Sequence, residues 1–250
     1  MVKINVCMGY LIGGAYIGML RIAKALPQYE WCFSTTIDKD AGIVIYMNEH
    51  RFYQDAKRLK IPHIIQRKTG IRSLKVKEPA DLDAVVCGSA VSYKNSSHKK
   101  RVLIYNGIDL EHLKTIKLKP NVEWLIAESR IGIGQQVEKS IKHAIKHSKH
   151  LTILGSGKGV AENTYDNLRK KYPMCSWVGR VSPDEALSYI KGCNAIIVSN
   201  PSHGVANQIL EATMFDKKII NFGNCEIPNK ADIDINVTAR KYKELINSCF

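Results

Sequence analysis

The chain has 250 residues, which is enough for one large domain or two small ones. A composition that is 45% hydrophobic and 24% charged is typical of a globular protein and predicts a sizeable core. No apolar segment is long enough for a membrane span, and the first residues lack the long apolar run of a signal peptide. The seven cysteines are scattered and never form a C-x-x-C pair, which argues against a disulfide framework or a zinc site and favours a reducing, cytoplasmic compartment.

The formal net charge is +14. Such a field attracts nucleic acid, anionic lipid head groups and phosphorylated substrates alike, so peripheral binding at the inner membrane face is open beside a purely cytoplasmic location. Solvated lysine-rich faces are the alternative interpretation. The cations are densest at Lys57–Lys60, Gln66–Lys77, Lys94–Arg101 and Lys139–Lys149.

Short apolar runs alternate with helical patterns in the first half of the chain, which predicts a parallel sheet. The expected strands are Lys3–Met8, Trp31–Phe33, Ile43–Met47, His63–Ile65, Ala84–Cys87 and Val102–Tyr105. The expected helices between them include Gly18–Ala25 and Arg51–Leu59.

The polar segment Leu110–Pro120 is expected to be a linker, and the alternation restarts after it. The expected strands are Trp124–Ala127, Leu151–Leu154, Trp177–Val181 and Ala195–Val198, and the expected helices are Gln136–His147, Ala161–Lys171, Pro183–Gly192, one from near Val205, and Ala239–Ser248. The sequence therefore predicts two αβ domains, residues 1–115 and 121–236, with a ligand cleft between them and a final helix within 237–250.

Two glycine-rich segments follow expected strands. Gly13 and Gly14, with Gly18 beyond, open a helix and would let a phosphate approach its N–H groups, but a tight strand–helix turn explains them equally well. The segment Gly155–Gly159 is not a P-loop, because Thr152 stands at the position of the first glycine and Gly159 follows the lysine.

Three Asp-x-Asp triplets could in principle hold a divalent cation. Asp81/Asp83 precedes its strand, whereas Asp38/Asp40 and Asp232/Asp234 lie in polar loops. None of these pairs directly follows an expected apolar strand, and no metal is expected.

The segment Trp177–Gly223 is the most informative part of the chain. It contains an apolar strand, a Pro-Ser-His-Gly turn and a helix that carries Glu211. Ligands of open α/β sheets bind outside the carboxyl ends of the strands, where the next helix N-terminus points at them. A phosphorylated ligand is therefore expected at Asn200–Val205.

The order of these motifs resembles the donor-binding half of retaining, nucleotide-sugar-dependent glycosyltransferases of the family-4 type. The resemblance rests on Gly179-Arg180-Val181, a Pro-Asp-Glu helix start, Pro-Ser-x-Gly and Glu211-Ala212, with the pentapeptide Tyr105–Asp109 before the linker. It implies an α/β GT-B fold with two Rossmann-like domains facing across a cleft, in compact form, and a C-terminal helix that packs back on the N-terminal domain.

The resemblance also implies roles for individual residues. Arg130 matches the arginine that holds the donor diphosphate, Glu211 matches the glutamate that binds the ribose, and Gly179–Val181 would contact the base. The chain departs from the family pattern twice: His203 stands where the first glutamate is expected, and Gln135 where a lysine is usual. The candidate catalytic residues are Arg130, His203 and Glu211, and the candidate donor-binding residues are Gly13, Gly14, Gln135, Gly155, Gly179, Arg180, Val181, Ser202, Gly204, Val205 and Asn207.

By resemblance, the chain is expected to be a hexosyltransferase-type enzyme. It would move a sugar from a UDP- or GDP-linked donor to an anionic or membrane-associated acceptor, with retention and without metal or other cofactor. His50 and His63 are candidates for touching the sugar from the N-terminal half. Two alternatives stay open: a nucleotide-sugar-binding protein that has lost catalysis, and a nucleic-acid-modifying glycosyltransferase.

Overall fold

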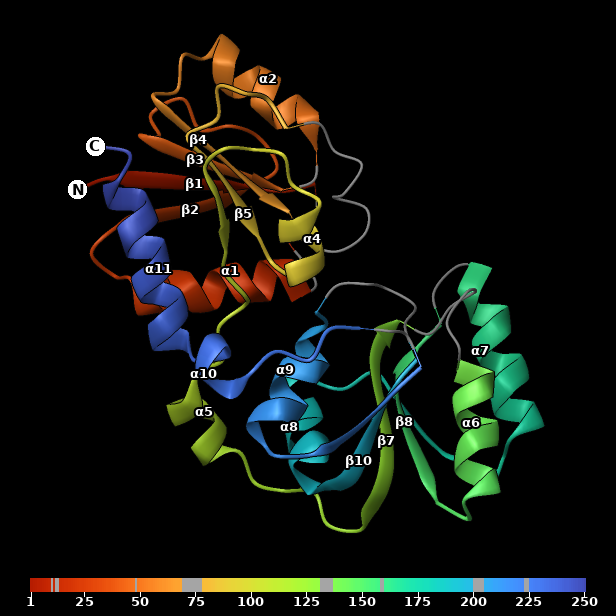
Figure 1. Cartoon of the computed structure of the whole chain (residues 1–250). Coiled ribbons are helices and arrows are strands. Elements are labelled where there is room, and N and C mark those ends of the chain that lie inside the picture. The colour runs from red at the N-terminus through yellow and green to blue at the C-terminus, as the bar shows by residue number, and fades with distance from the viewer. Residues whose placement is uncertain are drawn as a thin grey trace. The chain divides into compact units, whose positions relative to one another are not determined.

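The computed structural model describes residues 1–9, 11, 14–47, 49–68, 78–130, 137–157, 160–199, 205–222 and 225–250. The chain forms two compact units (Figure 1). Unit 1 comprises Met1–Asp109 and Ala231–Phe250, and unit 2 comprises Leu110–Lys230. Among the described residues, no helix is long and apolar enough to cross a bilayer.

Unit 1 is built on a six-stranded parallel sheet of order β2-β1-β3-β4-β5-β6. Its strands are β1 Lys3–Cys7, β2 Glu30–Ser34, β3 Ile43–Met47, β4 His63–Lys68, β5 Ala84–Cys87 and β6 Arg101–Leu103. Its helices are α1 Gly14–Ala25, α2 His50–Arg58, α4 Ala90–Lys94, α10 Lys230–Ile233, which begins at the boundary residue, and α11 Ile235–Asn247.

Successive side chains of a strand point to opposite faces of the sheet, so the strands of unit 1 contribute to two separate hydrophobic cores. One core joins β-strand residues such as Ile4 and Ile45 to α1 and to Tyr242 of α11. The other joins Val44 and its neighbours to Phe52 of α2. In Figure 1 the blue helix α11 lies beside the red helix α1, so the C-terminal helix packs back on the N-terminal unit, as the sequence predicted.

Unit 2 is built on a five-stranded parallel sheet of order β11-β10-β7-β8-β9. Its strands are β7 Val122–Arg130, β8 Leu151–Ser156, β9 Ser176–Gly179, β10 Cys193–Val198 and β11 Lys218–Asn221. Its helices are α5 Leu110–Thr115, α6 Val137–Lys146, α7 Val160–Lys171, α8 Pro183–Gly192 and α9 Asn207–Met214.

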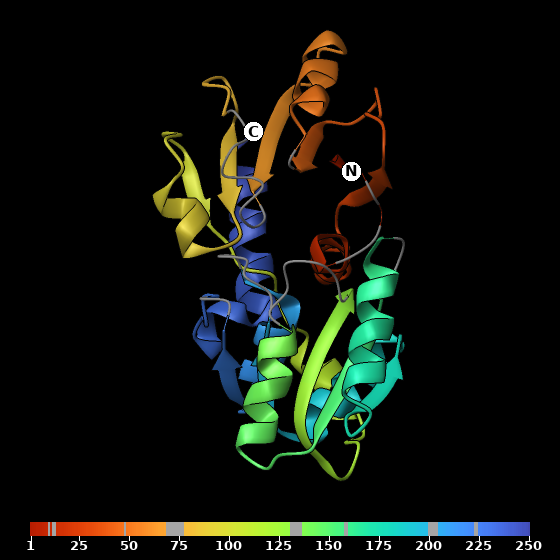
Figure 2. The same ribbon diagram turned by 90° about the vertical axis from the view of Figure 1, so that its right-hand side faces the viewer.

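Helices cover both faces of the unit 2 sheet. The green helices α6 and α7 lie side by side over one face (Figure 2), where Ile141 and Leu168 meet Trp124. On the other face, Ile190 of α8 and Ala212 of α9 pack on Leu125 and Ile196. Helix α8 begins as predicted at Pro183, because the Ser182 hydroxyl caps it by accepting the Glu185 N–H at 3.2 Å.

The structure corrects three expectations about local elements. Residues 110–115, expected within a linker, form the helix α5. Strand β4 does not stop at Ile65 but runs through three polar residues that are all buried, Gln66, Arg67 and Lys68. Lys218–Asn221, which is not among the expected strands, pairs in parallel with β10 as the edge strand β11.

Candidate functional site

The sheet order of unit 2 defines where a ligand can bind. From the first strand, β7, the chain steps outward to β8 and β9, then returns to the other side of β7 to form β10 and β11. The carboxyl ends of β7 and β10 therefore flank a point where the connections diverge, and such points bind ligands in open α/β sheets. The segments that follow Arg130 and Val198 start at this point.

Several predicted donor-site residues lie along this carboxyl edge. Arg130 is the last residue of β7 and is opposite Ser156 in the β7–β8 ladder, beyond a register shift that follows Ala127. In the next ladder, Leu154 is opposite Gly179. The strand pairing thus brings the backbone of Arg130, Gly155 and Gly179 to one edge. The side chain of Arg130 lies outside what the structure describes.

Both glycines at this edge have backbone conformations that favour glycine. Gly155 has φ of 111° and Gly179 has φ of 86°. A Cβ on Gly179 would meet no atom within 4 Å, so the space beside this turn is open among the described residues. The exposed Arg180 and half-buried Val181 follow directly, and Val181 packs on the core beneath α8 and α9.

Helix α9 presents its N-terminus near the end of β10. Its N-cap residue, Ala206, has no side chain that can accept a hydrogen bond, so the first N–H groups of the helix have no cap from that residue. Unsatisfied N–H groups and the helix dipole favour an anion at such an end. Val205 precedes the helix and Asn207 starts it, and both are half-buried.

Glu211 lies on the second turn of α9 and is half-buried. Its neighbours Leu210 and Ala212 are fully buried, so the carboxylate sits at the margin of the apolar core. Five predicted site residues, Gly13, Gln135, Ser202, His203 and Gly204, lie outside the described residues.

Unit 1 has its own connection switch, between β1 and β3. There, the Glu49 carboxylate packs directly on Gly9: a Cβ on Gly9 would lie 1.9 Å from Glu49 Oε1. Arg51 Nε is 2.7 Å from the other oxygen of Glu49. Gly14 begins α1 at the same edge of the sheet. A carboxylate at this place is a feature that sequence reasoning missed, because Glu49 belongs to no motif.

The two histidines suggested for sugar contact lie at opposite edges of the unit 1 sheet. His50 begins α2 immediately after β3, at the carboxyl edge, and stacks on Tyr53 with ring centroids 5.2 Å apart. His63 is the first residue of β4, at the amino edge. Only His50 is therefore on the side of the sheet where ligands of α/β folds bind.

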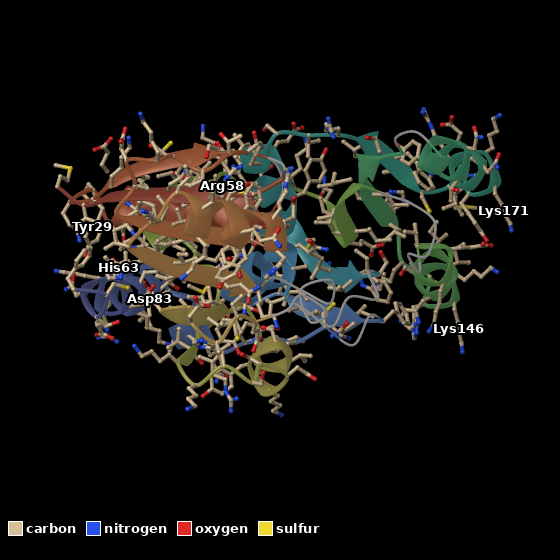
Figure 3. All side chains as sticks on the ribbon, turned by 90° about the horizontal axis from the view of Figure 1, so that it is seen from above. Tyr29, Arg58, His63, Asp83, Lys146 and Lys171 are labelled. Atoms are coloured by element: carbon tan, nitrogen blue, oxygen red, sulfur yellow. The ribbon has the colours of Figure 1, made fainter. Side chains whose placement is uncertain are left out.

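His63 takes part in a different cluster, with Asp83 and Cys249 (Figure 3 labels the first two). His63 Nδ1 is 3.2 Å from Asp83 Oδ1, and the potential ligand atoms of all three residues lie within 4.8 Å of one another. Histidine, carboxylate and thiol are ligands that Zn²⁺ accepts. Burial raises the pKa of the Cys249 thiol to about 11, so this group carries its proton at neutral pH unless a cation displaces it.

Four of the six aspartates of the Asp-x-Asp triplets have partners within the chain. Asp38 pairs with Lys3 at 2.8 Å, Asp81 pairs with Lys57 at 2.8 Å, and Asp234 caps α11 by accepting the Asn236 N–H at 2.7 Å. Asp83 accepts the Ile64 N–H at 2.7 Å.

One further residue at the carboxyl edge of unit 1 escaped sequence reasoning. Arg67, the fifth residue of β4, is 0% exposed. Its Nη2 donates to Asn106 Oδ1 at 2.6 Å. Desolvation by burial lowers the pKa of its guanidinium to about 10. No sequence pattern distinguishes Arg67 from the other cations of the lysine-rich stretch Gln66–Lys77.

No protein-family model matches this chain, and no curated protein matches its sequence. Its fold, however, matches solved structures of glycosyltransferases. Anabaena Alr3699/HepE, solved with UDP and glucose, is 12% identical with a TM-score of 0.65, over 100% of this chain and 93% of that chain. AviGT4, a glycosyltransferase involved in avilamycin A biosynthesis, is 10% identical with a TM-score of 0.63, over 99% and 97%. A glycosyltransferase from Rickettsia africae ESF-5 is 12% identical with a TM-score of 0.64, over 98% and 88%.

At identities this low, the similarity concerns the fold alone. The two parallel sheets with alternating helices, together with these matches over nearly the whole chain, show that this protein has the α/β GT-B fold.

Proposed function

We propose that this protein transfers a sugar from a nucleotide-diphosphate sugar, UDP- or GDP-linked, to an anionic or membrane-associated acceptor. The observation that carries the proposal is the connection switch of unit 2, where Arg130 ends β7 beside β10 and helix α9 follows, with an N-cap residue, Ala206, that makes no side-chain cap. Two solved structures of the fold, those of HepE, contain UDP with glucose or UDP-glucose, which supports a nucleotide sugar as the ligand here.

Each proposed role follows from the chemistry of the group. A guanidinium at Arg130 would neutralise the diphosphate, because it stays charged and donates to several phosphate oxygens. The N–H groups at the start of α9 would stabilise the negative charge of the diphosphate as it departs. Glu211 would accept hydrogen bonds from the ribose hydroxyls, and the open turn at Gly179–Val181 would receive the base.

The reaction would depend on positioning and electrostatics. Stabilising the departing diphosphate lowers the barrier to breaking the sugar–phosphate bond, and holding the acceptor hydroxyl nearby supplies the nucleophile. We propose retention of the anomeric configuration and no metal, and a hexose as the sugar. The family pattern has a glutamate and a lysine where this chain has His203 and Gln135. Donor binding without turnover would indicate that these replacements remove catalysis.

The experiment is a nucleotide-release assay with a panel of UDP- and GDP-sugars. Glu211→Gln and Arg130→Ala should abolish donor turnover. Two control variants carry the same types of substitution at the amino edge of the unit 2 sheet, away from the proposed site. They are Glu123→Gln near the start of β7 and Arg169→Ala in the last turn of α7. Near-normal turnover by either site variant would refute the donor site.

The acceptor side of the proposal rests on the basic clusters of unit 1. In the cluster Lys57–Lys60 two cations are already paired, Lys57 with Asp81 and Arg58 with Asp55. The cluster Lys94–Arg101 keeps three exposed lysines, Lys94, Lys99 and Lys100. Flotation with anionic liposomes at low salt tests a membrane surface as the partner, and no binding there would remove the membrane version of the proposal.

A further inference from the structure

Arg67 is a buried cation with unused hydrogen-bonding capacity. Its Nη2 is bonded to Asn106, but its Nε and Nη1 are buried and have no acceptor among the described residues. The ring of Tyr242 lies 5.5 Å from its Cζ and covers the guanidinium from α11. Desolvation accounts for its lowered pKa, and no described carboxylate pairs with it.

The undescribed residues of unit 1 include no carboxylate that could neutralise the charge of Arg67. They are residues 10, 12, 13, 48 and 69–77, and none of them is Asp or Glu. The neighbouring Lys68 shows the usual solution: it is equally buried but points to the other face of the sheet and pairs with Glu78. A buried charge without a partner is strongly unfavourable, so a residue of this kind needs a reason to be charged.

Two glycines lie close to Arg67 and its bonding partner at the carboxyl edge of the unit 1 sheet. Asn106, its bonding partner, follows β6 in the pentapeptide Tyr105–Asp109 and packs on Gly18 of α1, where a Cβ would lie 2.5 Å from Asn106 Oδ1. Gly88 follows β5, and a Cβ there would lie 3.9 Å from Arg67 Nη2. Neither the guanidinium nor its partner is therefore next to a bulky side chain at these two positions.

We propose that Arg67 binds the anionic oxygens of a small ligand, a phosphate or a carboxylate group, at the carboxyl edge of the unit 1 sheet. The ligand supplies the counter-charge that no described carboxylate gives Arg67, and the Nε and Nη1 groups that have no acceptor among the described residues donate to it. Assigning this ligand to the acceptor rests on the proposed glycosyltransferase function; the anion site itself does not.

Replacing Arg67 should have the opposite effect on stability from replacing an arginine that holds the fold together. An arginine that holds the fold together lowers stability when it is replaced. An unneutralised buried charge instead destabilises the ligand-free protein, so an uncharged side chain of similar length should leave it at least as stable. The same replacement should remove the response to the anion.

The test measures the melting temperature of the full chain in inorganic phosphate, in acetate and in sodium chloride at equal ionic strength. The variants are Arg67→Met and Arg67→Gln, the second of which keeps an N–H₂ donor for Asn106. The matched control is Arg58→Met on α2, whose side chain is 76% exposed (Figure 3). We expect phosphate or acetate to raise the melting temperature of the wild type and of Arg58→Met with increasing concentration.

Both Arg67 variants should lose that shift and should melt no lower than the wild type in chloride. The shift in phosphate against that in acetate identifies which anion the site takes. A wild type without a shift in either anion, an Arg67 variant that keeps the shift, or Arg67 variants that melt lower or do not fold would overturn the proposal. This experiment does not measure sugar transfer, so loss of the anion site would not contradict the proposed donor site. Conversely, a protein that transfers no sugar but keeps the anion-dependent shift would contradict only the proposed function.

Discussion

Arg130 and Ser156 are opposite each other at the end of the β7–β8 ladder, after a register shift that separates this pair from the regular pairing up to Ala127. The shift occurs where β7 reaches the connection switch of unit 2. Arg130 therefore ends β7 at the edge where we propose that the donor diphosphate binds.

Replacing Arg130 by alanine should therefore weaken binding of the donor nucleotide while leaving the fold intact. Losing a charge-assisted bond to a diphosphate costs about 1.5–3 kcal/mol, which corresponds to roughly a 10- to 150-fold weaker dissociation constant. Calorimetric titration of UDP and GDP into both proteins measures the change. Arg169→Ala should bind like the wild type, and unchanged affinity in Arg130→Ala would remove the arginine from the site.

Gly179 should resist substitution because of its backbone rather than for want of space. Its φ of 86° disfavours any residue with a Cβ, although a Cβ would meet nothing within 4 Å. Gly179→Ala should lower the free energy of unfolding by about 1–2 kcal/mol. In Gly42→Ala the new Cβ would make only ordinary contacts at 3.7 Å, to Lys3 O and Val2 Cγ1, so this control should change little. Urea unfolding followed by tryptophan fluorescence compares them; equal midpoints would contradict the strain.

Glu78 neutralises the buried Lys68 and also accepts the backbone N–H groups of Ser97 and His98 at 2.9 and 3.0 Å. Glu78→Ala would leave the Lys68 ammonium buried without a partner, so unit 1 should lose about 3–5 kcal/mol. Hydrogen exchange of the β4 and β5 amides reports this loss directly. The exposed pair Lys114–Glu111 offers the comparison, because Glu111→Ala should cost no more than about 1 kcal/mol. Equal effects of the two variants would contradict the burial argument.

Glu138 links α6 to α7 through a pH-dependent cluster. Hydrogen bonds from Lys171 at 2.9 Å, Tyr172 at 2.8 Å and the ammonium of Lys142 at 3.2 Å lower the pKa of its carboxyl to about 2. Because the pKa is lower in the folded than in the unfolded chain, this contribution is fully present above about pH 4.5. It is lost as the pH falls towards 2.

The wild type should accordingly melt higher than Glu138→Gln at pH 7, and the difference should shrink steadily below pH 4.5. Melting temperatures of both proteins measured from pH 7 down to pH 3 provide the check. A difference that stays constant over this range would show that the cluster does not depend on the ionised carboxylate.

Sequence patterns predicted the elements whose burial follows a simple period. Ile43–Met47, Ala84–Cys87 and Pro183–Gly192 have the expected bounds, because apolar runs or a capped helix start define them. The pattern failed where tertiary pairing overrides composition. Strand β4 continues through polar residues because Lys68 forms an ion pair with Glu78 and Arg67 donates a hydrogen bond to Asn106. Both partners lie outside the strand.

The site was predictable only in part for the same reason. Motifs single out Arg130, Gly179 and Glu211 as candidates, and the strand order of unit 2 brings the ends of β7, β8 and β9 to one edge. Arg67 and Glu49 could not be identified, because their significance lies in contacts with Asn106 and Gly9 that only the folded sheet creates.

The most direct test of a nucleotide-sugar site is a thermal-shift screen of the wild-type chain against a panel of UDP- and GDP-sugars, with Arg130→Ala measured in parallel. A ligand that binds the folded state at a hundred times its dissociation constant stabilises it by about 2.7 kcal/mol. We predict that at least one nucleotide sugar raises the melting temperature of the wild type in a concentration-dependent way and leaves that of Arg130→Ala unchanged. A panel that shifts neither protein, or shifts both equally, would contradict the account.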